Sequence, residues 1–69
     1  MEKRFRIEMQ SGDEFSAVCC PLDIDNGGRE LDDVELLTKR EAEKLLNELT
    51  DYCIQRGYRD RVLYIEEAL

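Results

Sequence analysis

Residues 38–57, TKREAEKLLNELTDYCIQRG, carry every signal of an amphipathic helix. Thr38 and Glu41 form a capping box, in which a hydroxyl and a carboxylate satisfy backbone N–H groups that the first helical turn leaves unpaired. Gly57 supplies a left-handed stop, and Arg56 suits the negative end of the helix dipole. The apolar residues recur at helical spacing and form one stripe: Ala42, Leu45, Leu46, Leu49, Tyr52 and Cys53. The pattern predicts a helix over 38–56 with one buried side.

Upstream of this helix, residues 3–20 predict a β-hairpin, because apolar and polar residues alternate in two runs separated by Ser-Gly-Asp at 11–13. A two-residue loop over 11–12 would set Met9 opposite Glu14. A three-residue loop over 11–13 gives apolar pairs instead: Met9 opposite Phe15, Ile7 opposite Ala17 and Phe5 opposite Cys19. A one-residue slip turns a whole strand face over, so we expect the three-residue loop, with Gly12 or Asp13 in a positive-φ bulge position.

The remaining elements follow from turn residues and from a second apolar run. Pro21 cannot donate to a sheet ladder, so we expect the second strand to end there and residues 21–37 to form an acidic loop. Residues 32–37 are compatible with a short extra strand or with a half-turn before the helix. The run RVLYIE at 61–66 predicts a final strand. Because its residues 62–65 are apolar on both faces, we expect a central or largely covered position in the sheet.

The order β-β-α-β predicts an α+β fold, a small, mainly antiparallel sheet with one helix packed on one face. At 69 residues the chain forms a single domain, 1–69. Three cysteines are an odd number, which argues against a disulfide framework and favours reduced thiols in a cytoplasmic protein. We expect Cys19 and Cys53 to face the core and Cys20 to face the other side of its strand. The N-terminal MEKRFRIEMQ lacks the hydrophobic run of a signal peptide.

The acidity of the chain is concentrated in its middle. The formal net charge is −7. The segment from Asp13 to Glu35 contains Arg29 as its only basic residue against eight acids: Asp13, Glu14, Asp23, Asp25, Glu30, Asp32, Asp33 and Glu35. The two flanking parts of the chain are close to neutral. A local negative field of this strength attracts basic partners and repels nucleic acid.

The stretch PLDIDNGGRELDD at 21–33 invites three other interpretations. An EF-hand loop that starts at Asp23 would have glycine at a ligand position and Val34 in place of the closing glutamate, so no metal is expected. A phosphate cradle needs a lysine after Gly27-Gly28 and no surrounding carboxylates. The third interpretation is a solvated turn, which accounts for the glycines but not for the cluster of acids.

Catalysis has little support in the residue types present. Without histidine, the commonest general base and the usual activator of cysteine or serine are missing, so we expect neither an enzyme nor a cofactor. The three thiols make an incomplete zinc set. Basic and aromatic residues alternate weakly over 55–64, but Asp60 interrupts them and the helix end accounts for Arg56.

In length, acidity and βαβ-type layout, the chain resembles small phage-encoded inhibitor proteins, including anti-CRISPR proteins, although no diagnostic motif carries the resemblance. The resemblance implies a protein-binding inhibitor in the host cytoplasm whose target is a CRISPR effector or another nucleic-acid-binding protein. The acidity itself predicts contact with a basic protein surface through six residues: Asp23, Asp25, Glu30, Asp32, Asp33 and Glu35. The alternative is an assembly module that forms a homodimer through an exposed edge strand.

Overall fold

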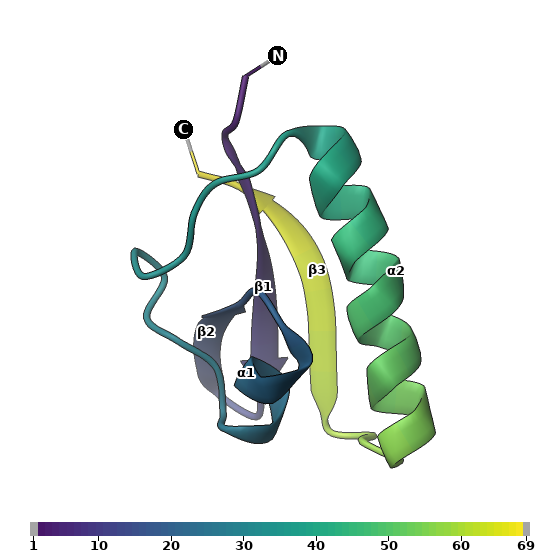
Figure 1. Ribbon diagram of the computed structural model, residues 1–69. Helices are drawn as coiled ribbons and strands as arrows, with labels where there is room; N and C mark the ends of the chain where they lie inside the picture. Colours follow the sequence, from purple (N-terminus) through teal and green to yellow (C-terminus); the bar gives the residue numbers. More distant parts are fainter. Residues whose placement is uncertain (1, 69) are drawn as a thin grey trace.

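The computed structural model describes residues 2–68 and shows a three-stranded antiparallel sheet with one long helix packed against it (Figure 1). The elements in chain order are β1 (Phe5–Ser11), β2 (Glu14–Val18), α1 (Pro21–Asp25), α2 (Lys39–Arg56) and β3 (Arg61–Glu67). The α+β class and the helix-on-sheet arrangement predicted from the sequence are therefore confirmed.

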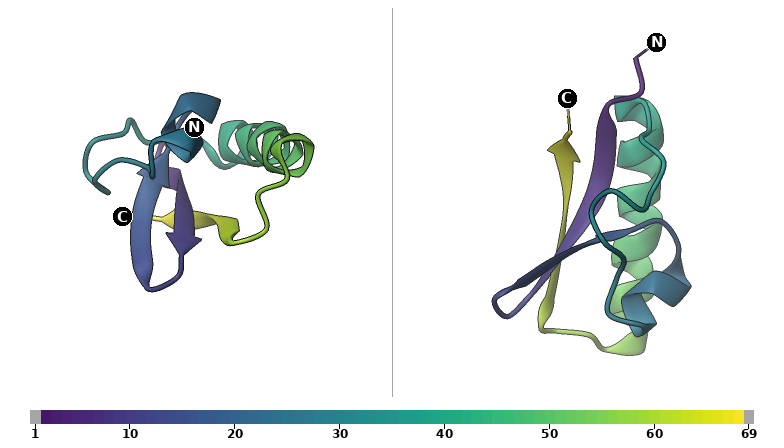
Figure 2. Two further views of the ribbon diagram at one scale, coloured as in Figure 1. Left: turned by 90° about the horizontal axis from the view of Figure 1, so that it is seen from below. Right: turned by 90° about the vertical axis from the view of Figure 1, so that its left-hand side faces the viewer.

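The strand order is β2-β1-β3, so the first strand of the chain is the central one. Both helices lie on the same side of the sheet, as the two views of Figure 2 show. The covered side holds Ile7 and Met9 of β1, each only 1% exposed, together with Val18 of β2. The other side of the sheet is not covered by a helix and carries Phe15 and Val62, both more than half exposed.

Helix α2 begins and ends where its sequence signals place it. Thr38 is the N-cap, and its hydroxyl accepts from the Glu41 N–H at 3.1 Å while the Glu41 carboxylate accepts from the Thr38 N–H at 2.9 Å. Gly57 adopts the left-handed conformation at the C-cap with φ 75°. The predicted stripe faces the core: Ala42, Leu49 and Cys53 are buried, and Leu45, Leu46 and Tyr52 are half-buried against them.

The predicted hairpin exists, but its predicted register is wrong. Ser11 pairs with Glu14, so the turn contains only Gly12 and Asp13, and Ile7 lies opposite Val18. Gly12 has φ 63°, whereas no residue other than glycine has positive φ among residues 2–68. A three-residue loop needs its left-handed residue in last place, which would be Asp13, while a two-residue primed turn suits glycine in first place. The turn therefore overrides the apolar pairing and leaves Phe15 57% exposed on the open face.

Two further expectations are corrected. Strand β3 lies at an edge of the sheet rather than at its centre, and Val62 is 58% exposed. The start of the expected loop over 21–37 is the short helix α1, since Pro21 at a first helical position fixes a helical φ and has no N–H to satisfy. Residues 32–37 form no strand, only a single bridge between Leu37 and Phe5.

Candidate functional site

The acidic middle of the chain is attached to the sheet at three places. Ile24 of α1 is fully buried in the core. Arg29 exchanges two backbone hydrogen bonds of 2.8 Å with Ala17 at the outer edge of β2. Leu37 exchanges backbone hydrogen bonds with Phe5 of β1 at 2.7 and 3.0 Å. Between the last two attachments, residues 30–36 run along the β2 side of the molecule, away from α2 (Figure 1).

The turn between α1 and Arg29, which brings the chain back to β2, depends on glycine. Gly28 has φ 89°, a conformation that L side chains rarely adopt, and it lies against β2. A Cβ atom at this position would overlap the side chain of Ser16 and lie 3.2 Å from the Ala17 carbonyl oxygen. Gly27 has nearly the same φ, 87°, but its added Cβ would meet nothing within 4 Å. Close approach of the backbone to β2 therefore explains why residue 28 is a glycine, whereas it does not apply to Gly27.

Asp23 is not part of an exposed acidic surface, which corrects one of the six predicted contacts. Its side chain is 7% exposed, and its Oδ1 accepts from Arg29 Nε at 2.8 Å. Its Oδ2 accepts from the Cys19 N–H at 2.9 Å and from the Cys19 thiol at 3.1 Å. Burial alone would raise the pKa of Asp23, but the hydrogen bonds from Arg29 and Cys19 outweigh burial and lower the pKa to about 2. The Asp23–Arg29 ion pair thus holds the chain that follows Gly28 against α1.

Asp25 is also engaged within the protein. Its two carboxylate oxygens accept from the hydroxyls of Tyr52 and Tyr58, each at 2.5 Å. These bonds, with that of Tyr52 the larger effect, lower the pKa of Asp25, and they raise the pKa values of both tyrosines. Asp25 therefore ties α1 to the C-terminal half of α2, although its carboxylate remains exposed to solvent.

The other four predicted contacts, Glu30, Asp32, Asp33 and Glu35, are exposed and lie within six consecutive residues. We call these four residues the acidic strip. No ion pair or side-chain hydrogen bond between residues 2 and 68 involves any of them. Leu31 and Val34, between them in sequence, are half-buried, so the backbone of the strip rests on the protein while its carboxylates remain in solvent.

A hollow of about 300 Å³ opens beside the acidic strip, where β2 has ended and Leu37 has not yet joined β1. Asp33 and Glu35 line it on the strip side. Its apolar lining consists of Ile7, Val18, Val34, Leu37 and Leu45. Arg6 and Arg29 also line the hollow, but each already donates its Nε to an internal carboxylate, that of Glu8 and that of Asp23 respectively. The combination offers an apolar wall next to two unpaired carboxylates.

The cysteines do not lie where the strand pattern predicted. Because β2 ends at Val18, Cys19 is exposed rather than in the core, whereas Cys53 is buried as expected. The thiols of Cys19 and Cys20 and a carboxylate oxygen of Asp23 lie within 4.8 Å of one another, a three-atom set that could hold a soft metal ion. Partial burial and the Asp23 carboxylate raise the pKa of Cys19 to about 11, which favours the protonated thiol. The hydrogen bonds from Cys19 to Asp23 hold two of these three groups together.

The local sequence pattern does not reveal the internal partners of Asp23 and Asp25. Arg29 is the only basic residue of the acidic segment, and its position six residues after Asp23, across Gly27-Gly28, suits a turn that brings the two together. The spacing of Tyr52 places it in the apolar stripe of α2 but does not show that its hydroxyl reaches Asp25, which is 27 residues away in the chain. These are long-range contacts, which local patterns do not report.

No protein-family model matches the chain, and comparisons with curated proteins and with solved structures found no similar protein. Within residues 2–68, no helix has both the length and the apolar character needed to cross a membrane.

Proposed function

We propose that this protein is a small inhibitor that acts by binding rather than by catalysis, and that it contacts a basic surface on a nucleic-acid-binding protein in the cytoplasm. The acidic strip, together with the adjoining hollow, is the contact. The target class is a CRISPR effector or another nucleic-acid-binding protein of the host, as the resemblance to phage-encoded inhibitors implies.

The observation that carries the proposal is that four carboxylates are exposed on one short segment and have no partner within the described chain. Other acids are paired within the protein, such as Glu8 with Arg6, Asp23 with Arg29, and Glu67 with Arg4. Several exposed acids outside the strip, Glu43 and Asp51 among them, have no such partner in the described chain, but they do not gather on one short segment. Unpaired carboxylates on an anchored segment keep a strong field with little loss of chain entropy on binding.

The hollow adds a reason for specificity. A lysine or arginine of the partner can place its methylene groups against the apolar wall and its charged end between Asp33 and Glu35. Charge pairs at the rim of such a contact mainly set the association rate and its salt dependence, whereas apolar burial slows dissociation.

The test compares two double variants of equal net charge. Asp32→Lys with Asp33→Lys reverses the centre of the acidic strip, whereas Glu43→Lys with Asp51→Lys reverses two exposed acids on α2. Wild-type protein immobilised in a pulldown from the native cytoplasm should retain a basic nucleic-acid-binding protein. The strip variant should lose it, the α2 variant should keep it, and added salt should weaken retention.

A purified target then allows the inhibitory step to be measured directly. The protein should compete with nucleic acid for that target, and the strip variant should not compete although its thermal midpoint is unchanged. A target that binds the two double variants equally well, or that binds independently of salt, would contradict the proposed role of the acidic strip.

A further inference from the structure

The outer edge of β3 presents backbone groups with no partner. The Ala68 N–H donates to the Arg4 carbonyl, and the backbone groups of Phe5 are used by Leu37 on the other side of β1. Hydrogen-bonded pairs alternate along an antiparallel ladder. Given the observed β1–β3 register, Val62, Tyr64 and Glu66 therefore direct their N–H and C=O groups toward β1. The backbone groups of Arg61, Leu63, Ile65 and Glu67 consequently point outward.

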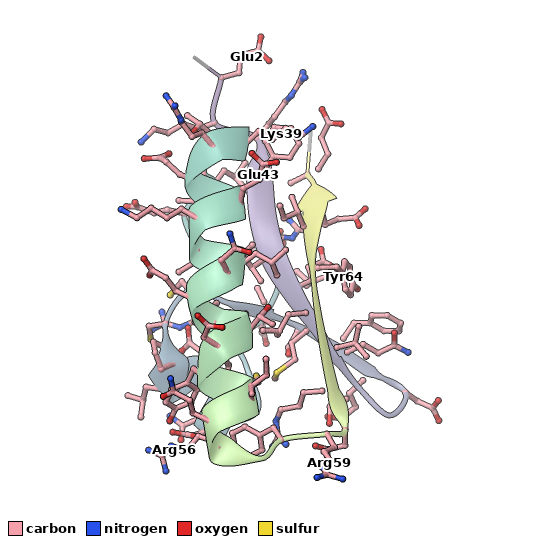
Figure 3. All side chains as sticks on the ribbon, turned by 90° about the vertical axis from the view of Figure 1, so that its right-hand side faces the viewer. Glu2, Lys39, Glu43, Arg56, Arg59 and Tyr64 are labelled. Atoms are coloured by element: carbon pink, nitrogen blue, oxygen red, sulfur yellow. The ribbon has the colours of Figure 1, made fainter. Side chains whose placement is uncertain are left out.

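The opposite edge of the sheet is partly covered by other segments of the chain. There, Arg29 covers the end of β2 at Ala17 and Leu37 covers the start of β1 at Phe5, as single bridges. No backbone hydrogen bond in residues 2–68 reaches the outward groups of β3 from another segment. Strand β3 contains no proline, and its charged residues lie only at its two ends, so its centre from Val62 to Ile65 carries no charge against pairing. Figure 3, viewed toward this edge, shows β3 in front of β1 and beside α2.

The charges and side chains of β3 are complementary to those of a second β3 strand that runs antiparallel to it. The strand begins with Arg61 and ends with Glu66 and Glu67. An antiparallel partner keeps each side chain on its own face of the sheet only if residues of like orientation lie opposite each other. The register centred on Tyr64 meets this condition and sets Leu63 opposite Ile65 of the second copy. It also sets the positive end of each strand, Arg61, opposite the negative end of the other, Glu67.

We propose that two copies of this chain pair through β3 in this register, so that the two sheets form one continuous sheet with Tyr64 at the two-fold axis. Arg61 is already held in place, since its guanidinium lies 4.0 Å from the Tyr58 ring centre and pairs with Asp60 at 2.8 Å. Tyr64 lies on the side of β3 away from α2, so no helix separates the two tyrosines (Figure 3).

The net charge of −7 on each copy opposes association, but the distribution of charge reduces this cost. The acidic strip lies on the β2 side of the molecule, opposite the free edge of β3 (Figure 1). Repulsion between exposed charges is screened beyond about 10 Å at moderate salt. The dimer then carries one acidic strip at each end, and neither strip is covered. The inference is independent of the function proposed above, since the two surfaces do not overlap.

The first experiment measures amide hydrogen exchange of the full chain by NMR at several protein concentrations. In a monomer, the N–H groups of Val62, Tyr64 and Glu66 are protected by β1, while those of Leu63 and Ile65 exchange quickly. Pairing through β3 should protect Leu63 and Ile65 as the concentration rises, in parallel with a monomer-to-dimer shift in sedimentation. A chain that stays monomeric, or a dimer that leaves these two amides unprotected, overturns the proposal.

The second experiment tests the register. Val62 is 58% exposed on the open face, and the register sets it opposite Glu66 of the second copy. Val62→Lys should therefore dimerise about tenfold more tightly than Val62→Glu, because two opposite-charge cross-strand pairs replace two like-charge pairs. Leu22→Lys and Leu22→Glu make the same changes in net charge at a 63% exposed position on α1. An equal difference between the two Leu22 variants would assign the effect to net charge and refute the register.

Discussion

Replacing Asp23 by asparagine should destabilise the protein in a way that depends on pH. The ordinary pKa of the Asp23 carboxyl is 3.8, and the hydrogen bonds from Arg29 and Cys19 lower it to about 2 in the folded state. At about 1.4 kcal/mol for each pKa unit, this difference corresponds to about 2 kcal/mol of stability. Because the folded pKa is depressed, that contribution is fully present above the unfolded pKa and is lost as pH falls through 3.8 toward about 2.

Asparagine removes the charge but keeps the shape of the side chain. At neutral pH, the free energy of unfolding of Asp23→Asn should be about 2 kcal/mol lower than that of the wild type. Toward about pH 2 the wild-type carboxyl becomes neutral as well, so the two proteins should converge in stability. A residual difference would measure how poorly the amide fits the donors of Arg29 and Cys19.

The assay is urea unfolding followed by circular dichroism at a series of pH values, with the two proteins at equal salt. Asp33→Asn, in the exposed acidic strip, serves as the control for loss of one charge and should follow the wild-type curve within about 0.5 kcal/mol. A stability difference for Asp23→Asn that stays constant from neutral to acid pH would refute the reasoning. So would a difference equal to that of the control.

Two further predictions concern positions where the chain offers a matched control. Gly28→Ala should lower the free energy of unfolding by at least about 1 kcal/mol more than Gly27→Ala does. Both positions have the unfavourable positive φ, but only a side chain at position 28 collides with Ser16. Equal losses of stability in urea unfolding would show that this contact is unimportant. Thr38→Ala should cost about 1 kcal/mol through loss of the helix cap, whereas Thr50→Ala, exposed within the helix, should not destabilise, and thermal midpoints that fall equally would contradict the capping role.

The sequence was sufficient for features that depend on neighbours along the chain. The bounds of α2 followed from Thr38, Glu41 and Gly57, because capping bonds connect residues that are at most a few positions apart. Its buried side followed from spacing, and the existence of three strands followed from alternation and from one apolar run. Five of the six predicted contact acids are exposed, all but Asp23, and four of these five form the acidic strip.

Only the tertiary structure decided which acids are free and which strand lies at the edge. Asp23 turns inward because Arg29 returns across two glycines to meet it, and Asp25 is taken by tyrosines from distant positions. The edge position of β3 depends on β1 pairing with both other strands, which a run of apolar residues cannot reveal. Each of these outcomes is a competition between long-range contacts, and local residue patterns determine only the elements that compete.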